Sequence, residues 1–143
     1  MNHAPIGKHC ILEIHGCPSH LLDDESFIRE ALAEASRQGM STLLNLTSHK
    51  FHPQGCTALA LLAESHISIH TWPEAGYAAV DVFTCGETSQ PEMACAYLVE
   101  QFKATGYQLK SLPRGAAAGI PMHHTHRHEE AEAVEAGLCE ASV

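Results

Sequence analysis

The sequence has few basic residues, no long apolar run and no leader-like N-terminus. Lysine and arginine together number 8 against 17 aspartates and glutamates, which gives a formal net charge of −9. This balance disfavours the phosphate backbone of nucleic acids and suits a cationic small molecule. No window approaches the roughly 18 apolar residues of a membrane span, and no basic segment followed by an apolar run opens the chain. We therefore expect a cytoplasmic protein that binds neither nucleic acid nor membranes.

The sequence also lacks any C-x-x-C pair, which argues against a zinc knuckle or a dithiol redox motif. Without a secretion signal we expect free thiols, most of them small core residues. The cysteines are Cys10, Cys17, Cys56, Cys85, Cys95 and Cys139. The length of 143 residues suits one domain with a real core and is too short for two.

Hydrophobic periodicity predicts both strands and helices. A helix is expected over residues 22–38, capped by Asp23 or Asp24, and a second helix is expected between a cap at Ser89 and a stop at Gly106. Apolar alternation and turn residues mark the strands. The predicted strands cover residues 10–15, 41–47, 56–63, 67–72, 77–85 and 107–112.

The order of these elements is strand, helix, four strands, helix, strand. Such an order predicts an α+β fold, in which an antiparallel sheet carries both helices on one face. The other face would then be uncovered, and a bare apolar sheet face usually meets a partner. A homodimer that pairs sheet to sheet would give a four-layer αββα sandwich.

Residues 122–143 form a His-rich and Ala/Glu-rich tail after a single domain over residues 1–121. Clustered imidazoles bind nickel, copper or zinc in solution, but one short segment supplies neither fixed tetrahedral geometry nor supporting hydrogen bonds. The cluster consists of His123, His124, His126 and His128. We expect a solvated tail and no metal site. A non-catalytic metal-binding module that uses the tail is a remote alternative.

The segment AESHISIHTWPE, residues 63–74, carries more reactive groups than a core strand needs. The carbonyl carbon nearest to the Ser65 hydroxyl is that of Glu64, and attack there would convert an amide into an ester. His70 lies five residues further on, so strict alternation places it on the opposite face from Ser65. A bend at Ser65 and His66 would remove that objection.

The segment ESHISIHTWPE, together with GYAAVDVFTCG at residues 76–86, resembles the self-processing, pyruvoyl-dependent S-adenosylmethionine decarboxylases of the short prokaryotic type. The resemblance covers about residues 6–121, and the central motif is long and unusual in composition. Further comparable residues occupy positions 7–9, 48–51, 114–115 and 119–121.

This resemblance implies that Ser65 attacks the Glu64 carbonyl, that the ester undergoes β-elimination, and that the dehydroalanine hydrolyses to a pyruvoyl group. The chain would become two pieces, residues 1–64 and 65–143. His70 matches the base that removes the Cα proton of residue 65, and Cys85 matches the acid that protonates the substrate α-carbon. The substrate amine would form a Schiff base with the covalent pyruvoyl group, so no metal or dissociable coenzyme is required.

The resemblance also implies a substrate site. Glu74 matches a glutamate that binds the ribose hydroxyls, Phe51 and Trp72 match aromatic groups around adenine, and Glu13 would lie near the site. The sequence departs from the family at Thr57, where a serine usually donates to the attacked carbonyl, and at Lys8, which is often arginine. Threonine keeps the hydroxyl but adds a methyl group, and lysine is not equivalent to arginine as an anion binder.

The implied activity is decarboxylation of S-adenosylmethionine to decarboxylated S-adenosylmethionine and CO2, which supplies the aminopropyl donor for spermidine. The implied partner is a second copy of the chain, because groups from both protomers build each site in this family. The same scaffold and cofactor acting on arginine or ornithine is the alternative, and Glu74 and Phe51 favour the nucleoside substrate.

Overall fold

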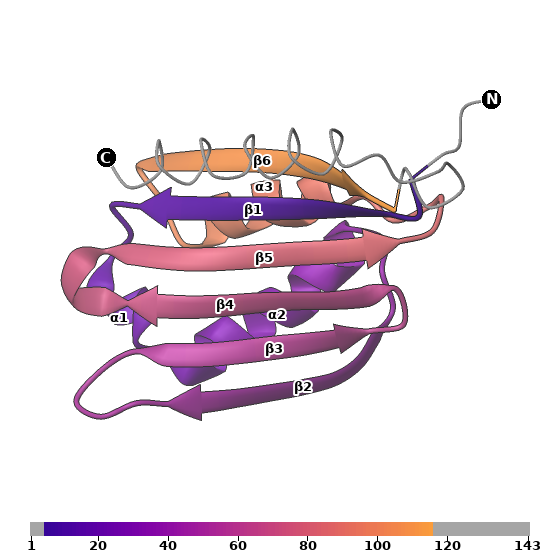
Figure 1. Ribbon diagram of the computed structural model, residues 1–143. Helices are drawn as coiled ribbons and strands as arrows, with labels where there is room; N and C mark the ends of the chain where they lie inside the picture. Colours follow the sequence, from indigo (N-terminus) through magenta and orange to yellow (C-terminus); the bar gives the residue numbers. More distant parts are fainter. Residues whose placement is uncertain (1–4, 116–143) are drawn as a thin grey trace.

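The structure, a computed structural model, describes residues 5–115. They form one antiparallel sheet with its helices on one side (Figure 1). The six strands lie in the order β2-β3-β4-β5-β1-β6. The strands are β1 Gly7–His15, β2 Leu43–Lys50, β3 Cys56–Leu62, β4 Ser65–Trp72, β5 Tyr77–Cys85 and β6 Gly106–Arg114. The helices are α1 Ser19–Leu22, α2 Glu25–Gln38, α3 Pro91–Gln101 and the 3-10 turn η1 Pro73–Ala75. The predicted fold class is confirmed.

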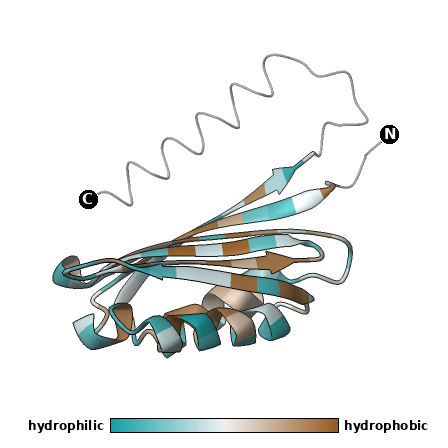
Figure 2. Cartoon of the chain, turned by 90° about the horizontal axis from the view of Figure 1, so that it is seen from below, coloured by the Kyte–Doolittle hydropathy of each residue, from teal (hydrophilic) through white to brown (hydrophobic). Residues whose placement is uncertain are grey.

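The core lies between the sheet and the two long helices, which share one side of the sheet in Figure 2. Alternate residues of each central strand point toward α2 and α3, as the two-residue period of a strand requires. Phe102 and Phe27 meet edge to face with ring centroids 5.3 Å apart. The largest buried apolar side chains are Leu12, Ile14, Leu22, Ile28, Leu32, Ile67, Ile69, Val80, Val82, Leu98 and Phe102.

The first helix is shorter than predicted and is preceded by a separate turn. Asp24 is the N-cap of α2, and its carboxylate accepts a hydrogen bond from the Phe27 amide at 3.0 Å. Asp23 ends α1 instead, and its carboxylate accepts from the Gly55 amide at 2.8 Å. The chain therefore breaks between the two aspartates because each carboxylate binds a different part of the backbone.

The second helix differs from the prediction at both ends. Ser89 is not its cap: Gln90 holds the N-cap position without a side-chain bond, and Ser89 is buried with its hydroxyl 3.5 Å from that of Ser41. Gly106 does not end the helix but opens β6. The helix ends at Gln101 because Phe102 is anchored in the core, and the chain leaves through Lys103 at a φ of 52°.

The strands mostly extend beyond their apolar cores. β1 begins at Gly7, β4 begins at Ser65, β2 continues to Lys50, and β6 continues to Arg114, although sequence periodicity marked shorter runs. Polar residues join these strands because neighbouring strands supply backbone partners, an effect that outweighs local propensity. The β3–β4 hairpin closes through the two residues Ala63 and Glu64, so Leu62 pairs with Ser65.

The face away from the helices, here called the open face, is more polar than predicted. It carries exposed apolar side chains at Leu59, Leu61 and Trp72, which are 38%, 48% and 43% exposed. Strand register places histidines among them: His9, His15, His49, His66 and His70. Protein–protein interfaces commonly mix apolar and polar groups in this way.

No helix among residues 5–115 is long and apolar enough to cross a membrane. The five cysteines within this part of the chain are free thiols. The tail over residues 122–143, with its histidines and Cys139, lies outside the described residues, as does the 119–121 segment.

Candidate functional site

The Glu64–Ser65 bond lies where the β3–β4 turn enters β4, and both the backbone carbonyl and the side-chain carboxylate of Glu64 accept hydrogen bonds. The Glu64 carbonyl oxygen accepts a hydrogen bond from the Cys85 amide at 3.0 Å. The Glu64 carboxylate accepts from the Thr42 amide at 2.8 Å and from its hydroxyl at 3.3 Å. The carbonyl carbon beside Ser65 is therefore fixed in position and polarised by a backbone donor.

Ser65 has an unfavourable backbone conformation. Its φ is +153°, in a region that residues with a Cβ atom rarely adopt. Glycine is the residue that adopts such a φ readily, but the residue here is the serine whose hydroxyl is nearest along the chain to the Glu64 carbonyl. Strain of this kind clusters at reactive positions, where the surrounding structure enforces it.

Cys85 ends β5 on the open face, directly opposite Gly7 of β1. A Cβ atom at Gly7 would lie 2.8 Å from the Thr84 carbonyl oxygen and 2.9 Å from the Phe83 ring. Any larger residue would push β1 away from β5 at this point. Gly7 thus keeps the strand that carries Cys85 in register beside the Glu64–Ser65 bond. We call Glu64, Ser65 and Cys85 the cleavage end of the sheet.

Thr57 and His70 lie at the opposite end of the open face. They are direct partners in the β3–β4 ladder, and the Thr57 hydroxyl is 2.9 Å from His70 Nδ1. This bond orients the ring and leaves Nε2 available for proton transfer. A pocket of about 380 Å³ adjoins them, and its lining includes Phe51, Trp72 and Glu74. We call these five residues the pocket end.

Glu13 joins the pocket end through a residue that sequence reasoning missed, Tyr77. The Tyr77 hydroxyl donates a hydrogen bond to the Glu13 carboxylate. Burial first, and then this carboxylate, raises the pKa of the phenol, which stays protonated as a donor. Trp72 stacks on the Tyr77 ring with centroids 5.3 Å apart. The short connection over residues 73–76 was the signal, because it makes Trp72 and Tyr77 cross-strand partners.

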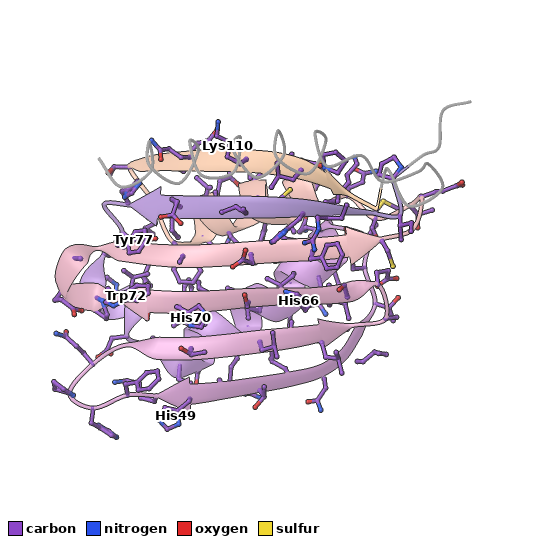
Figure 3. The ribbon with its side chains drawn as sticks, in the orientation of Figure 1. His49, His66, His70, Trp72, Tyr77 and Lys110 are labelled. Atoms are coloured by element: carbon purple, nitrogen blue, oxygen red, sulfur yellow. The ribbon has the colours of Figure 1, made fainter. Side chains whose placement is uncertain are left out.

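The two ends do not meet within one chain. His70 lies five residues from Ser65 along β4, a separation of roughly 16 Å at the usual rise of a strand. The bend that would place Ser65 on the same face as His70 is absent. Ser65 and His66 both pair with β5, and Ser65 lies opposite Thr84, which is buried toward the helices. Figure 3 shows His70 and Trp72 toward one end of β4 and His66 toward the other. The two groups of candidate residues therefore lie at opposite ends of β4 in one chain.

A second group missed by sequence reasoning crosses the open face near the cleavage end. His9 Nε2 lies 2.9 Å from the Asp81 carboxylate, and an Arg114 nitrogen lies 3.1 Å from His9 Nδ1. An arginine nitrogen only donates, so Nδ1 is the acceptor in its contact with Arg114, and Nε2 is the ring nitrogen that faces the Asp81 carboxylate. Arg114 also lies over the Phe83 ring, 5.1 Å from its centroid. Sequence alone gave no signal for this contact across three strands.

Lys8, the position where the family often has arginine, faces the helix side rather than the open face. Its ammonium lies 3.5 Å from the Glu92 carboxylate of α3. Both side chains are partly exposed, so this ion pair contributes little to stability. Within residues 5–115 no group of three or more His, Cys, Asp or Glu is arranged to hold a metal ion.

Comparisons with known proteins agree with the motif. The family model described as S-adenosylmethionine decarboxylase matches residues 8–115. A protein from Prochlorococcus marinus (strain MIT 9211), named S-adenosylmethionine decarboxylase proenzyme, is 62% identical over 109 residues, which is 76% of this chain and 89% of that protein. A protein of the same name from Synechococcus sp. (strain WH7803) is 56% identical over 115 residues, covering 80% of this chain and 90% of that protein.

A solved structure has the same fold. The crystal structure of the adenosylmethionine decarboxylase from Aquifex aeolicus superposes with a TM-score of 0.73 at 36% sequence identity. The superposition covers 78% of this chain and 92% of that chain.

Proposed function

The chain belongs to the S-adenosylmethionine decarboxylase family, and from this premise we propose that it cuts itself between Glu64 and Ser65 and then decarboxylates S-adenosylmethionine. The observation that carries the proposal is the geometry of the cleavage end. A strained serine adjoins a carbonyl whose oxygen already accepts the Cys85 amide at 3.0 Å. A bond held in this way is prepared for attack from its own C-terminal side.

Cleavage starts when the Ser65 hydroxyl oxygen attacks the Glu64 carbonyl carbon. The Cys85 amide, which already binds the carbonyl oxygen, stabilises the negative charge that develops there. The carbon–nitrogen bond then breaks, the nitrogen takes the hydroxyl proton, and the peptide has become an ester. Release of strain at Ser65 favours this rearrangement.

The ester is then eliminated. A base removes the Cα proton of residue 65, the carbon–oxygen bond at Cβ breaks, and Glu64 leaves with a free carboxylate. The dehydroalanine takes up water and releases ammonia, which leaves a pyruvoyl group on residue 65. His70 has the chemistry for the base, since an imidazole accepts protons near neutral pH. Its Nδ1 is already bonded to Thr57, so Nε2 is the atom that acts.

His70 reaches residue 65 only from a second protomer, because the two lie roughly 16 Å apart in one chain. We propose a homodimer in which the open faces meet, related by a two-fold axis that runs across the strands at mid-length. Such an axis places the cleavage end of one protomer over the pocket end of the other, and it does so twice. Aligned sheets pack about 10 Å apart, within reach of side chains from both. Leu59, Leu61 and Trp72 would be covered.

The decarboxylation uses the same residues after cleavage. A pyruvoyl group at residue 65 supplies the sink for the electron pair left when CO2 departs. The Cys85 thiol lies on the open face, one residue beyond Thr84, the ladder partner of Ser65, and it delivers the proton to the substrate α-carbon. Glu74 accepts from the ribose hydroxyls, and the Phe51 and Trp72 rings, which line the pocket, hold adenine. The net charge of −9 attracts the sulfonium substrate.

The cleavage is tested by denaturing mass spectrometry of the purified chain. Wild-type protein is expected as two pieces, residues 1–64 and residues 65–143 with a ketone at the new N-terminus. Ser65→Ala has no attacking oxygen and is expected to stay whole and inactive. A wild-type chain that stays intact would contradict the proposal.

The substrate is tested on the cleaved protein. Release of CO2 is measured separately with S-adenosylmethionine, arginine and ornithine. We expect turnover of the nucleoside substrate only, with Glu74→Gln raising KM because it weakens the ribose contact. Turnover of arginine or ornithine alone would retain the cofactor chemistry and reject the substrate.

A further inference from the structure

Thr84 carries the one buried side-chain oxygen or nitrogen in residues 5–115 that has no hydrogen-bond partner. The residue is 2% exposed and faces the helix side of β5. A buried hydroxyl without a partner costs folding free energy, and valine, which has the same shape, would avoid that cost. The hydroxyl therefore has no stabilising role that the folded structure shows.

The neighbours of Thr84 are the residues of the cleavage end. Strand register places Thr84 directly opposite Ser65 of β4. The next residue, Cys85, provides the amide that binds the Glu64 carbonyl oxygen. On its other side Thr84 lies opposite Lys8, whose ammonium pairs with Glu92. The unpartnered hydroxyl thus stands across the ladder from the strained serine.

We propose that the Thr84 hydroxyl is the hydrogen-bond partner of the Ser65 side-chain oxygen during self-cleavage. Directly opposed residues on antiparallel strands have Cβ atoms about 5 Å apart, and Thr–Ser pairs at this distance can hydrogen-bond across the ladder after rotation about χ1. This inference rests on the proposed self-cleavage. It adds a group from the same protomer as Ser65, whereas His70 comes from the partner.

The role follows from the path of one oxygen atom. This atom begins as the Ser65 hydroxyl, becomes the bridging oxygen of the ester, and leaves as one oxygen of the new Glu64 carboxylate. A threonine hydroxyl both accepts and donates. Before the attack, the Thr84 oxygen accepts a hydrogen bond from the Ser65 hydroxyl. This bond directs a lone pair of the Ser65 oxygen toward the Glu64 carbonyl carbon. It then donates to the same oxygen as negative charge develops there during elimination.

The test measures the rate of cleavage and the species that accumulates. Uncleaved protein, collected soon after synthesis, is incubated, quenched in acid and analysed by mass spectrometry, with and without neutral hydroxylamine. Hydroxylamine cuts the ester and leaves an unmodified serine at position 65, whereas completed cleavage leaves a pyruvoyl group. The two outcomes differ in mass, so intact chain, ester and product are counted separately.

Thr84→Val is expected to cleave roughly tenfold or more slowly than wild type, because the reacting oxygen loses a partner. Thr84→Ser keeps the hydroxyl and is expected to restore the rate. The free energy of unfolding of Thr84→Val is expected to equal or exceed that of wild type. Ser36→Ala is the control, since Ser36 is a buried hydroxyl bonded within α2 to the Leu32 carbonyl. It is expected to cleave at the wild-type rate.

A wild-type cleavage rate in Thr84→Val would overturn the proposal. It would also be overturned if Thr84→Val cleaved slowly and was less stable than wild type, while Thr84→Ser failed to restore the rate. If Thr84→Val fails to fold, Thr84→Ser and Thr84→Ala isolate the hydroxyl in a smaller side chain, and equal rates for these two would reject it. Failure of the wild-type chain to cleave would instead reject the proposed function, so the two failures are distinguishable.

Discussion

Thr71 and Thr84 lie on the neighbouring strands β4 and β5, and both are buried against the helices, yet their hydroxyls differ completely. The Thr71 hydroxyl accepts from the Cys56 amide at 2.9 Å and donates to the Leu22 carbonyl at 2.6 Å. It therefore ties α1 and the start of β3 to β4. The Thr84 hydroxyl has no such bond. The same substitution should thus have opposite effects at the two sites.

We predict that Thr71→Val destabilises the fold by about 1–3 kcal/mol, because the buried Cys56 amide loses its partner. Thr71→Ser keeps both hydrogen bonds and is expected to retain most of the stability. Urea unfolding followed by circular dichroism, on chains that also carry Ser65→Ala so that all remain uncut, gives the comparison. Equal unfolding midpoints for Thr71→Val and its parent would show that this hydroxyl is not structural.

At the scale of single residues, the sequence places the reactive groups but not their contacts. The motif predicts that Ser65, His70 and Cys85 matter, and these assignments stay predictions. The pairing of Thr57 with His70 could not be read from the sequence, because the register of β3 against β4 depends on how the turn at Ala63 and Glu64 closes. Asp81 and His9, 72 residues apart, meet only through sheet order.

At the scale of elements, the connection between β2 and β3 carries Phe51 to the pocket, and Asp23 fixes that connection. Its carboxylate accepts from the Gly55 amide at 2.8 Å and pairs with Lys50 Nζ at 2.9 Å, and Lys50 also donates to the Phe51 carbonyl at 3.1 Å. The Gly55 amide first, and then Lys50, holds the pKa of Asp23 below its ordinary value of 3.8. The charged carboxylate is thus the form that holds the loop.

Because the folded pKa is depressed, the stabilising contribution of Asp23 is present above pH 3.8 and is lost as pH falls through the folded value. We predict that the Gly55 amide proton shift titrates with a midpoint below 3.8 in an NMR series. Asp23→Asn is expected to abolish that titration and to raise KM several-fold at neutral pH, since Phe51 is held less firmly.

Glu34→Gln is the matched control for this loop, because Glu34 is an acidic residue paired with Arg37 on the exposed side of α2. It is expected to change neither the Gly55 titration nor KM. A Gly55 midpoint at or above 3.8 in the wild-type chain would contradict the assigned contact.

The elements themselves show where local signals suffice. Asp24 caps α2 because the aspartate, the following helix formers and the apolar period agree with one another. The prediction that Gly106 ends the second helix was wrong. A glycine after a helical stretch favours a helix C-terminus, but this helix ends earlier, where Phe102 enters the core. The polar start of β4 at Ser65 lacked alternation, so only pairing with β3 and β5 made it a strand.

At the scale of the whole molecule, the separation of the cleavage end from the pocket end is the reason we propose that two protomers build each site. Sequence order alone suggested that Ser65 and His70 belong together, and it could not reveal that the strand between them is straight. The resemblance to the family supplied the shared site. The distance along β4 now gives that expectation a geometric reason.

We predict that two inactive variants restore each other. Coexpressed Cys85→Ala and His70→Ala chains form mixed dimers, in which one site draws Ser65 and Cys85 from the His70→Ala chain and His70 from the other chain. Random pairing should give about a quarter of wild-type activity. Tags of different mass identify each chain in a mass spectrum, and a decarboxylation assay measures the activity.

The identity of the cut chain decides between a shared and a single-chain site. With a shared site, the His70→Ala chain is cleaved only beside its Cys85→Ala partner. If His70 acted within its own chain, the His70→Ala chain would stay whole in every mixture, and no activity would return. Dimers assembled after separate expression of each variant serve as the control for mixing.

The strand order β2-β3-β4-β5-β1-β6 determines how the two pieces would be held together after the proposed cleavage between Glu64 and Ser65. The first fragment would own β1, β2 and β3, and the second β4, β5 and β6. The strands of the two fragments are intermixed in the sheet, because β1 of the first fragment lies between β5 and β6 of the second. Three strand pairs would join the two fragments, namely β3–β4, β5–β1 and β1–β6, so separating the fragments would require breaking the backbone hydrogen bonds of all three. Severing the backbone therefore creates a new chain end without loosening the architecture that holds it.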